Sequence, residues 1–247
     1  MKDLFLLLLR GKFKKAKKIF FQKLDHYLDK KRSRNFFSPI SRELLVSQND
    51  YRPIIYKNFN YEHSIYRETF KKFKSNKGGL FERNNKIRHF YADFYEESLQ
   101  NHKVENLLEI GIEDGGSLRA WSTLFPDANI FGADVNKNYL FEELKIKTFY
   151  TDQLDENELN SLSEKLKDKK FDIIIDDGLH TFEANIKTFE ALFPLLDSKS
   201  GIYFIEDIIF KDLKKYYLYF NNKYNIKIVE CLNNNENYQN CLIQIKT

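Results

Sequence analysis

The chain has 247 residues, 42% of them hydrophobic, and includes 23 Phe and 15 Tyr. This length accommodates one large domain with an appendage, or two small domains, with a sizeable core. The net charge of +4 is uneven, because residues 1–34 carry twelve Lys and Arg against three Asp, a net +9, which leaves −5 for the other 213 residues. The basic character therefore belongs to the N-terminal segment, and we do not expect the main domain to bind nucleic acid.

Residues 1–34 are predicted to form a basic amphipathic helical segment, because apolar residues recur at helical spacing with lysines between them. Two interpretations stay open. The helix lies on an anionic membrane surface or a partner, or it packs on its own domain or on a second subunit. Leu4–Leu9 is too short to span a bilayer, and no small-residue cleavage site follows it. We expect a cytoplasmic homo-oligomer, with peripheral membrane association as an alternative.

The two cysteines, Cys231 and Cys241, flank a predicted hairpin turn at residues 233–237. Two cysteines in a chain of this length suit a reducing compartment, and we interpret both as unpaired core thiols.

Three regions follow from the pattern along the chain: residues 1–34, a cap at 35–88 with short helical or irregular pieces, and a main domain at 89–247. Strands are predicted near 106–110, 129–133, 145–150, 171–176, 201–206, 224–231 and 240–246. Helices are predicted near 89–100, 117–125, 157–167, 181–195 and 208–220.

The last two predicted strands have no helix between them, so they must pair as an antiparallel hairpin. A mainly parallel, seven-stranded α/β sheet that ends in such a hairpin is typical of the Rossmann-like class I methyltransferase fold. We predict this fold, with an N-terminal helical extension.

A glycine-containing loop follows the first predicted strand of the main domain, from Gly111 to Ser117, and leads into a helix. Glycines let the backbone approach a ligand, and the helix N-terminus offers backbone amides, so this is the geometry of a nucleotide site. The second strand ends at Asp134, where a carboxylate binds ribose hydroxyls in such sites.

The charge around this loop indicates which nucleotide it binds. The G-x-G-x-x-G fingerprint is absent, and Glu109, Glu113 and Asp114 surround the loop. These carboxylates would repel a pyrophosphate, at a cost of about 1–4 kcal/mol for a close pair of like charges. S-adenosylmethionine has no phosphate and carries a sulfonium and an ammonium, so the charge favours it over NAD. A degenerate nucleotide fold remains the alternative.

Asp152 and Gln153 follow the third strand, at the place where such sites bind adenine through a carboxylate or amide edge. The alternative is a helix cap, because a helix is predicted to begin a few residues later.

Acidic side chains also follow two neighbouring predicted strands: Asp176 and Asp177 after the fourth, Glu206 and Asp207 after the fifth. Adjacent strands lie about 4.8 Å apart, so these carboxylates can converge on one cation. A set of three carboxylates, Asp177, Glu206 and Asp207, suits Mg²⁺, with Mn²⁺ or Fe²⁺ as alternatives. For any single acid, capping of the following helix is the competing interpretation.

His180 lies three residues beyond Asp177. A divalent metal lowers the pKa of a bound oxygen, and an imidazole with an ordinary pKa near 6.5 can accept the proton. We therefore predict His180 as the general base of an attack by an alcohol oxygen on the sulfonium methyl.

Several of these motifs together resemble a known family. They are LLEIGIEDGGSLRAW at 107–121, FGAD at 131–134, TDQLD at 151–155, FDIIIDDGLH at 171–180 and YFIED at 203–207, with HFYADFYE at 89–96 upstream. They resemble the metal-dependent sugar O-methyltransferases of the macrocin and mycinamicin type, and bacterial enzymes that methylate sugars of capsules and other surface polysaccharides, including heptoses. The resemblance covers about residues 85–210.

The resemblance implies S-adenosylmethionine, a divalent metal and a sugar or nucleotide-sugar substrate. The residues that it places at the cofactor are Glu109, Gly111, Ser117, Asp134, Asp152 and Gln153, to which we add Asp176. It places the metal at Asp177, Glu206 and Asp207, and His180 as the base. Two departures stand out: the glycine loop is shorter and more acidic than in the macrolide enzymes, and Leu179 replaces a small polar residue.

The leading hypothesis is therefore a sugar O-methyltransferase in surface-polysaccharide synthesis. The alternatives are methyl transfer to a non-sugar diol, and a non-catalytic scaffold that keeps the fold. An oxidoreductase is disfavoured by the acidic loop and the missing third glycine.

Overall fold

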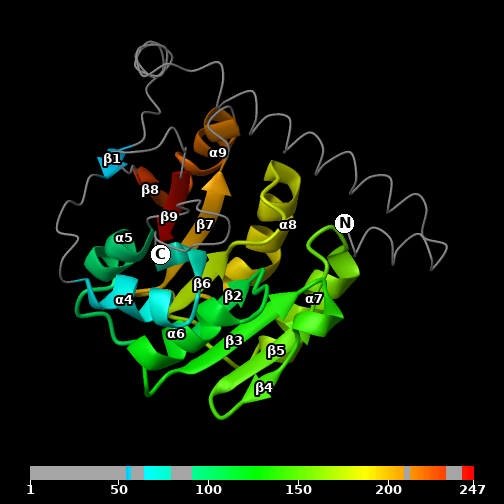
Figure 1. The fold of residues 1–247 in the computed structure, drawn as a ribbon. Helices are drawn as coiled ribbons and strands as arrows, with labels where there is room; N and C mark the ends of the chain where they lie inside the picture. The colour runs from blue at the N-terminus through cyan, green and yellow to red at the C-terminus, as the bar shows by residue number, and fades with distance from the viewer. Residues whose placement is uncertain (1–53, 57–63, 79–90, 209–211, 232–240) are drawn as a thin grey trace, which may run out of the picture. The chain divides into compact units, whose positions relative to one another are not determined.

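A computed structural model describes part of the chain, and Figure 1 draws it as a ribbon. The described residues are 54–56, 64–78, 91–208, 212–231 and 241–247. The predicted helix at 1–34, most of the cap and the hairpin turn at 233–237 lie outside them. The chain divides into two compact units, Met1–Asp50 and Tyr51–Thr247, and all of the described residues belong to the second.

All seven predicted strands are present, and each lies within two residues of its predicted bounds. They are β2 (Asn106–Ile110), β3 (Asn129–Asp134), β5 (Ile146–Tyr150), β6 (Ile173–Asp176), β7 (Ile202–Ile208), β8 (Asn225–Cys231) and β9 (Cys241–Lys246). The sheet has the order β1-β8-β9-β7-β6-β2-β3-β5-β4. β9 runs antiparallel to both β7 and β8, which confirms the predicted terminal hairpin.

Two short strands were not predicted. β1 (Ile54–Tyr56) pairs parallel with β8, and β4 (Glu142–Glu143) pairs antiparallel with β5. Part of the predicted cap therefore belongs to the sheet itself. Segments of two or three residues are too short to show the alternation by which a strand is predicted.

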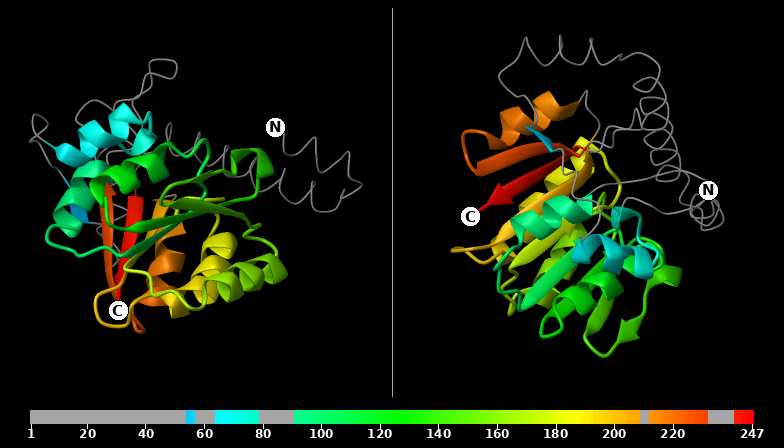
Figure 2. Two further views of the ribbon diagram at one scale, coloured as in Figure 1. Left: turned by 90° about the horizontal axis from the view of Figure 1, so that it is seen from below. Right: turned by 60° about the vertical axis from the view of Figure 1, so that its left-hand side comes forward.

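Helices cover both faces of the sheet, as Figures 1 and 2 show. One face packs against α4 (Ile65–Lys72), α5 (Tyr91–Ser98) and α6 (Gly116–Leu124). The other packs against α7 (Glu156–Leu166), α8 (Phe182–Leu192) and α9 (Leu213–Phe220). Among the described residues, no helix has both the length and the apolar character needed to cross a membrane.

The apolar strands supply both hydrophobic cores because successive side chains of a strand point to opposite faces. In β6, Ile173 and Ile175 join the core under α5 and α6, whereas Ile174 joins the core under α8 and α9. In β2, Leu107 and Leu108 divide in the same way. A run such as Ile173–Ile175 is apolar throughout because both of its faces are buried.

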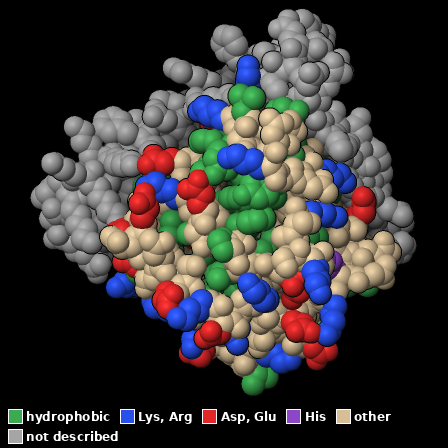
Figure 3. Space-filling view, turned by 180° about the vertical axis from the view of Figure 1, so that it is seen from behind, with side chains coloured by type: hydrophobic (Ala, Val, Ile, Leu, Met, Phe, Trp, Pro, Cys, Tyr) green, Lys and Arg blue, Asp and Glu red, His purple; other side chains and the backbone are tan. Residues whose placement is uncertain are grey.

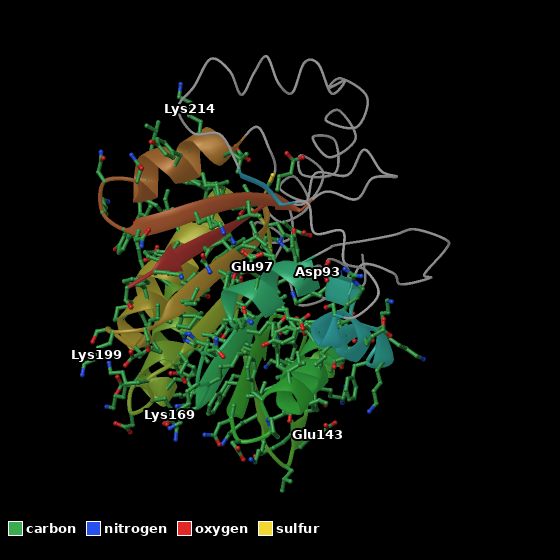
Figure 4. The ribbon with its side chains drawn as sticks, turned by 90° about the vertical axis from the view of Figure 1, so that its left-hand side faces the viewer. Asp93, Glu97, Glu143, Lys169, Lys199 and Lys214 are labelled. Carbon is green, nitrogen blue, oxygen red and sulfur yellow. The ribbon has the colours of Figure 1, made fainter. Side chains whose placement is uncertain are left out.

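A buried ion pair fixes α4 against α5. Arg67 of α4 binds the carboxylate of Asp93 in α5, and both side chains are almost fully buried. Figure 4 shows Asp93 on the side of α5 that faces α4, whereas Glu143, Lys169 and Lys199 lie at the rim of the ribbon. The ion pair also bears on the position of the chain segment that follows α4, which enters the site described below.

One face of the molecule is shown in space-filling form in Figure 3. Acidic and basic side chains are interspersed around a central group of hydrophobic ones. The described part of this face presents no continuous basic surface.

Candidate active site

The predicted site residues gather where three neighbouring parallel strands end. β6 lies between β2 and β7, with Asp176 paired to Ile110 on one side and to Ile205 on the other. Gly111, Asp177 and Glu206 each follow one of these paired residues. They therefore lie at the carboxyl edge of the sheet, where open α/β sheets bind ligands.

Gly111 allows the ends of β2 and β6 to approach closely. Its φ is +88°, and a Cβ built there would lie 2.2 Å from the backbone oxygen of Asp177. The Asp177 amide donates to the carbonyl of Ile110 at 2.9 Å. A glycine is needed here because any side chain would separate the two strand ends.

Asp134 holds the loop that begins at Gly111. Its carboxylate accepts from the backbone amides of Ile112 at 3.1 Å, Glu113 at 3.3 Å and Asn136 at 2.7 Å. The side chains of Glu113 and Asp114 are exposed, so the loop presents negative charge to the solvent. The predicted ribose ligand therefore also fixes the backbone of the loop.

Gln153 joins the loop after β5 to the loop after β6. Its Nε2 donates to Asp176 at 2.6 Å and to Thr188 at 2.9 Å, and its Oε1 accepts from the Leu179 amide at 2.7 Å. Asp152 is buried and accepts from the Leu154 amide at 3.0 Å, whereas Asp155 is the residue that caps α7. Both predicted adenine-binding residues lie in the site region, but the Gln153 amide is already engaged by the protein.

Asp176 is a fully buried carboxylate whose partners are amides. It accepts from Asn185 at 2.9 Å as well as from Gln153, and Asn185 in turn accepts from the Tyr216 hydroxyl at 2.6 Å. Burial raises the pKa of Asp176 to about 6, although the hydrogen bonds from Asn185 and Gln153 lower it.

Glu109 is buried in the middle of the site. Its carboxylate accepts from the indole of Trp121 at 3.1 Å. Burial raises its pKa, and the neighbouring Lys77, together with Ser117 in the first turn of α6, opposes that shift. Glu109 and Ser117, both predicted at the cofactor, therefore lie near each other.

Lys77 is the site residue that sequence reasoning missed. It lies in the short 3₁₀ helix η1 (Asn76–Gly78), and its ammonium is 2.6 Å from Asp177, 2.7 Å from Glu206 and 3.2 Å from Glu109. Asp177 and Glu206 belong to the set predicted to converge on a metal ion, and the structure places an ammonium beside both of them. The sequence gives no signal for it, because one lysine among 40 basic residues does not stand out.

The charges of this cluster shift one another's pKa values. Burial alone lowers the pKa of Lys77, but Asp177, Glu206 and Glu109 outweigh it and hold that pKa well above its ordinary value. Burial raises the pKa of Glu206 well above its ordinary value, Asp177 raises it further, and Lys77 opposes both. The Tyr95 hydroxyl donates to the second oxygen of Glu206. The surrounding carboxylates thus keep the Lys77 side chain protonated and positively charged.

His180 lies between two carboxylates at the open side of the cluster. Its Nε2 is 3.9 Å from Asp177 and 3.8 Å from Asp207, and the Asp207 carboxylate also accepts from the Tyr91 hydroxyl at 2.8 Å. Both His180 and Asp207 have left-handed backbones, with φ of 57° and 54°. Non-glycine residues adopt this conformation at a cost of about 1–3 kcal/mol, and it clusters at functional sites.

A divalent cation fits part of the predicted set. Donor atoms of two predicted ligands, Asp177 and Asp207, and of the predicted base His180 lie within 4.8 Å of one another, and the carboxylate oxygens suit Mg²⁺. The third predicted ligand, Glu206, differs from the other two because both of its oxygens already accept hydrogen bonds, one from Lys77 and one from Tyr95. The structure therefore brings together Asp177, His180 and Asp207, while the Lys77 ammonium contacts Glu206 and one oxygen of Asp177.

The chain is similar to curated enzymes over about half of its length, among them the following two, and no family model matches it. Mycinamicin VI 2''-O-methyltransferase of Micromonospora griseorubida is 35% identical over 130 residues, which are 49% of this chain and 32% of that enzyme. Demethylmacrocin O-methyltransferase of Streptomyces fradiae is 36% identical over 129 residues, with the same two shares. The chain thus spans about a third of the length of the curated relatives that it matches.

A solved methyltransferase structure has the same fold. The plantazolicin methyltransferase BpumL in complex with SAH aligns over 94% of this chain and 98% of its own, with a TM-score of 0.50 at 16% identity. The methyltransferase MycE of the mycinamycin pathway, in complex with Mg, SAH and mycinamycin VI, is 30% identical over 60% of this chain and 40% of its own, with a TM-score of 0.49. As the motifs predicted, the chain is similar to macrolide O-methyltransferases over about half of its length, and it has the Rossmann-like fold of class I methyltransferases.

Proposed function

We propose that the chain transfers the methyl group of S-adenosylmethionine to a sugar hydroxyl, with a divalent cation as second cofactor. The observation that carries this proposal is the convergence of Asp177, His180 and Asp207 at the carboxyl edge of the sheet. Similarity to the two macrolide enzymes supports a sugar as the acceptor.

We place the acceptor, a nucleotide- or polymer-linked sugar, in surface or capsule polysaccharide synthesis in the cytoplasm. The low cysteine content supports this compartment.

The cofactor site in this proposal lies along the loop from Gly111 to Ser117. S-adenosylmethionine supplies an electrophilic methyl group when it is bound. Gly111 keeps the loop close to the strand ends, and Asp134 holds the loop while it offers oxygens to ribose hydroxyls. The other residues assigned to this site are Glu109, Asp152, Gln153 and Asp176. Negative charge at the loop favours a cationic cofactor over one with phosphates.

The residues proposed to hold the divalent cation are Asp177, Glu206 and Asp207. Mg²⁺ is the first choice because all three offer carboxylate oxygens, and Mn²⁺ and Fe²⁺ are alternatives. When bound, the cation lowers the pKa of a hydroxyl that coordinates it.

His180 is proposed as the general base that accepts the proton of the acceptor hydroxyl. Its Nε2 lies near two carboxylates, which stabilise the imidazolium that forms. The side chain is partly exposed, so a substrate can reach it.

The first test is calorimetry on the purified chain with S-adenosylmethionine, S-adenosylhomocysteine and NAD. We expect the first two to bind and NAD not to bind. Labelled S-adenosylmethionine and a panel of nucleotide-sugars should then show methyl transfer that EDTA abolishes while cofactor binding persists. Binding of NAD alone would end the methyltransferase proposal.

The second test replaces His180 with Asn, which tolerates the left-handed backbone. Removal of a general base is expected to lower the rate by about 10²–10⁴-fold. Binding of S-adenosylmethionine and Mg²⁺ should stay within about twofold of the parent, because the carboxylates remain. His102→Asn, which removes an imidazole before β2, is the control. A fully active His180→Asn variant would show that another group accepts the proton.

A further inference from the structure

Lys77 occupies a cation position inside the acidic cluster, and its side chain is 1% exposed. Three carboxylates, from β2, β7 and the loop after β6, lie within 3.2 Å of its ammonium. Such a buried amine is retained only when its charge is matched, and here the acids match it.

The turn that carries Lys77 is fixed in place. The Ser75 amide donates to the Phe70 carbonyl of α4 at 2.9 Å, and a Cβ on Gly78 would lie 3.0 Å from the Arg67 carbonyl. Arg67 is itself paired with Asp93 of α5. The ammonium is therefore held at the strand ends by packing as well as by charge.

Lys77 divides the carboxylate oxygens into two sets. Its ammonium takes Asp177 Oδ2 and Glu206 Oε2 and approaches Glu109 Oε1, while Tyr95 takes Glu206 Oε1. Asp177 Oδ1 and Asp207 Oδ2 face His180 instead. Mg²⁺ requires oxygen ligands at about 2.0–2.1 Å. An ammonium and a divalent ion cannot both hold the same oxygens, and their like charges repel.

We propose that Lys77 is a tethered cation that competes with a divalent metal for Asp177 and Glu206. Metal binding at these two residues must displace the ammonium, so Lys77 weakens the affinity of the site for divalent ions. This inference rests on the divalent-cation part of the proposed function.

The test is Lys77→Met, which keeps the length of the side chain and removes its charge. Calorimetry with Mg²⁺ and with Mn²⁺, without substrate, should show at least about tenfold tighter binding than in the parent. The thermal midpoint of the variant should also rise more with metal than that of the parent. Lys72→Met, which removes a lysine from α4, is the control and should bind metal as the parent does.

A different outcome is expected if Lys77 has only a structural role. If Lys77 only positions the carboxylates, Lys77→Met will bind metal with equal or lower affinity, and the inference is overturned while the proposed function stands. Absence of metal binding in the parent and in the variant overturns both.

A variant that folds only when Mg²⁺ or Mn²⁺ is present supports the inference, because the metal then replaces the ammonium. If neither Lys77→Met nor Lys77→Gln folds with or without metal, the ammonium is not replaceable and the inference fails.

Discussion

Asp176 shows how a single buried carboxylate responds to its surroundings. Its oxygens receive hydrogen bonds from Gln153 and Asn185, yet burial still dominates and raises its pKa to about 6. Asp176 thus links the loop after β5 to α8 through these two hydrogen bonds. Its ionised form is destabilised by burial.

This shift predicts a pH-dependent stability. Because the folded-state pKa exceeds the ordinary 3.8, protonation of Asp176 favours the folded state. The contribution is complete below about pH 4 and is lost as the pH rises through about 6. The shift contributes about 3 kcal/mol to the free energy of unfolding, because each pKa unit corresponds to about 1.36 kcal/mol.

Urea unfolding of Asp176→Asn and of the parent between pH 3.5 and 7, with EDTA present, measures this contribution. The difference in free energy of unfolding should change by this amount across the window. The exposed Asp127→Asn variant is the control and should follow the parent. A constant difference between Asp176→Asn and the parent would contradict the prediction.

At the scale of single residues, the sequence predicts the acids and His180 because they follow apolar strands directly. It does not predict Lys77, which lies 100 residues from Asp177 and 129 residues from Glu206. Nor does it predict that the predicted metal ligand Glu206 accepts from Tyr95. Side chains that enter a site from a distant turn leave no local pattern.

At the scale of the elements, the alternation of strands and helices is predicted because buried strands and amphipathic helices have distinct hydrophobic periods. β6 and α8 illustrate this, because Ile173–Ile175 is apolar throughout whereas α8 alternates buried and exposed faces. The failures are β1 and β4, whose existence depends on pairing with β8 and β5 and not on their own composition.

The contact between β2 and β6 predicts a large effect of Gly111→Ala. A positive φ costs alanine about 1–3 kcal/mol, and the clash with the Asp177 backbone adds to it. Gly115→Ala is the matched control, since its φ is +78° but its Cβ would meet the ring of Phe141, a side chain that can move.

Chemical denaturation should therefore show a larger loss of stability for Gly111→Ala than for Gly115→Ala, by at least about 1 kcal/mol. S-adenosylmethionine binding should weaken in the Gly111 variant as well. Equal losses in the two variants would mean that the strand ends are not held together at Gly111.

At the scale of the whole molecule, both hydrophobic cores and all predicted site residues lie within Tyr51–Thr247. The two curated relatives also match only about half of the chain. The motifs quoted from the sequence are continuous segments that all lie within this unit. No comparable motif stands in residues 1–50.

A fragment of residues 51–247 is therefore expected to unfold in one cooperative transition and to bind S-adenosylmethionine within about threefold of the full chain, since a domain with its own core folds alone. Circular dichroism melts and calorimetry on the fragment and the full chain provide the comparison. A fragment without a cooperative transition would show that residues 1–50 complete the fold.

The bridge from η1 to three strand ends has a consequence for motion. Movement of α4 and η1 away from the sheet would separate Glu109, Asp177 and Glu206 from the ammonium that is their counter-ion. The backbone amides of α4 and of the strand ends should therefore exchange their hydrogens together, at a rate close to that of global unfolding. This layer is not expected to open locally.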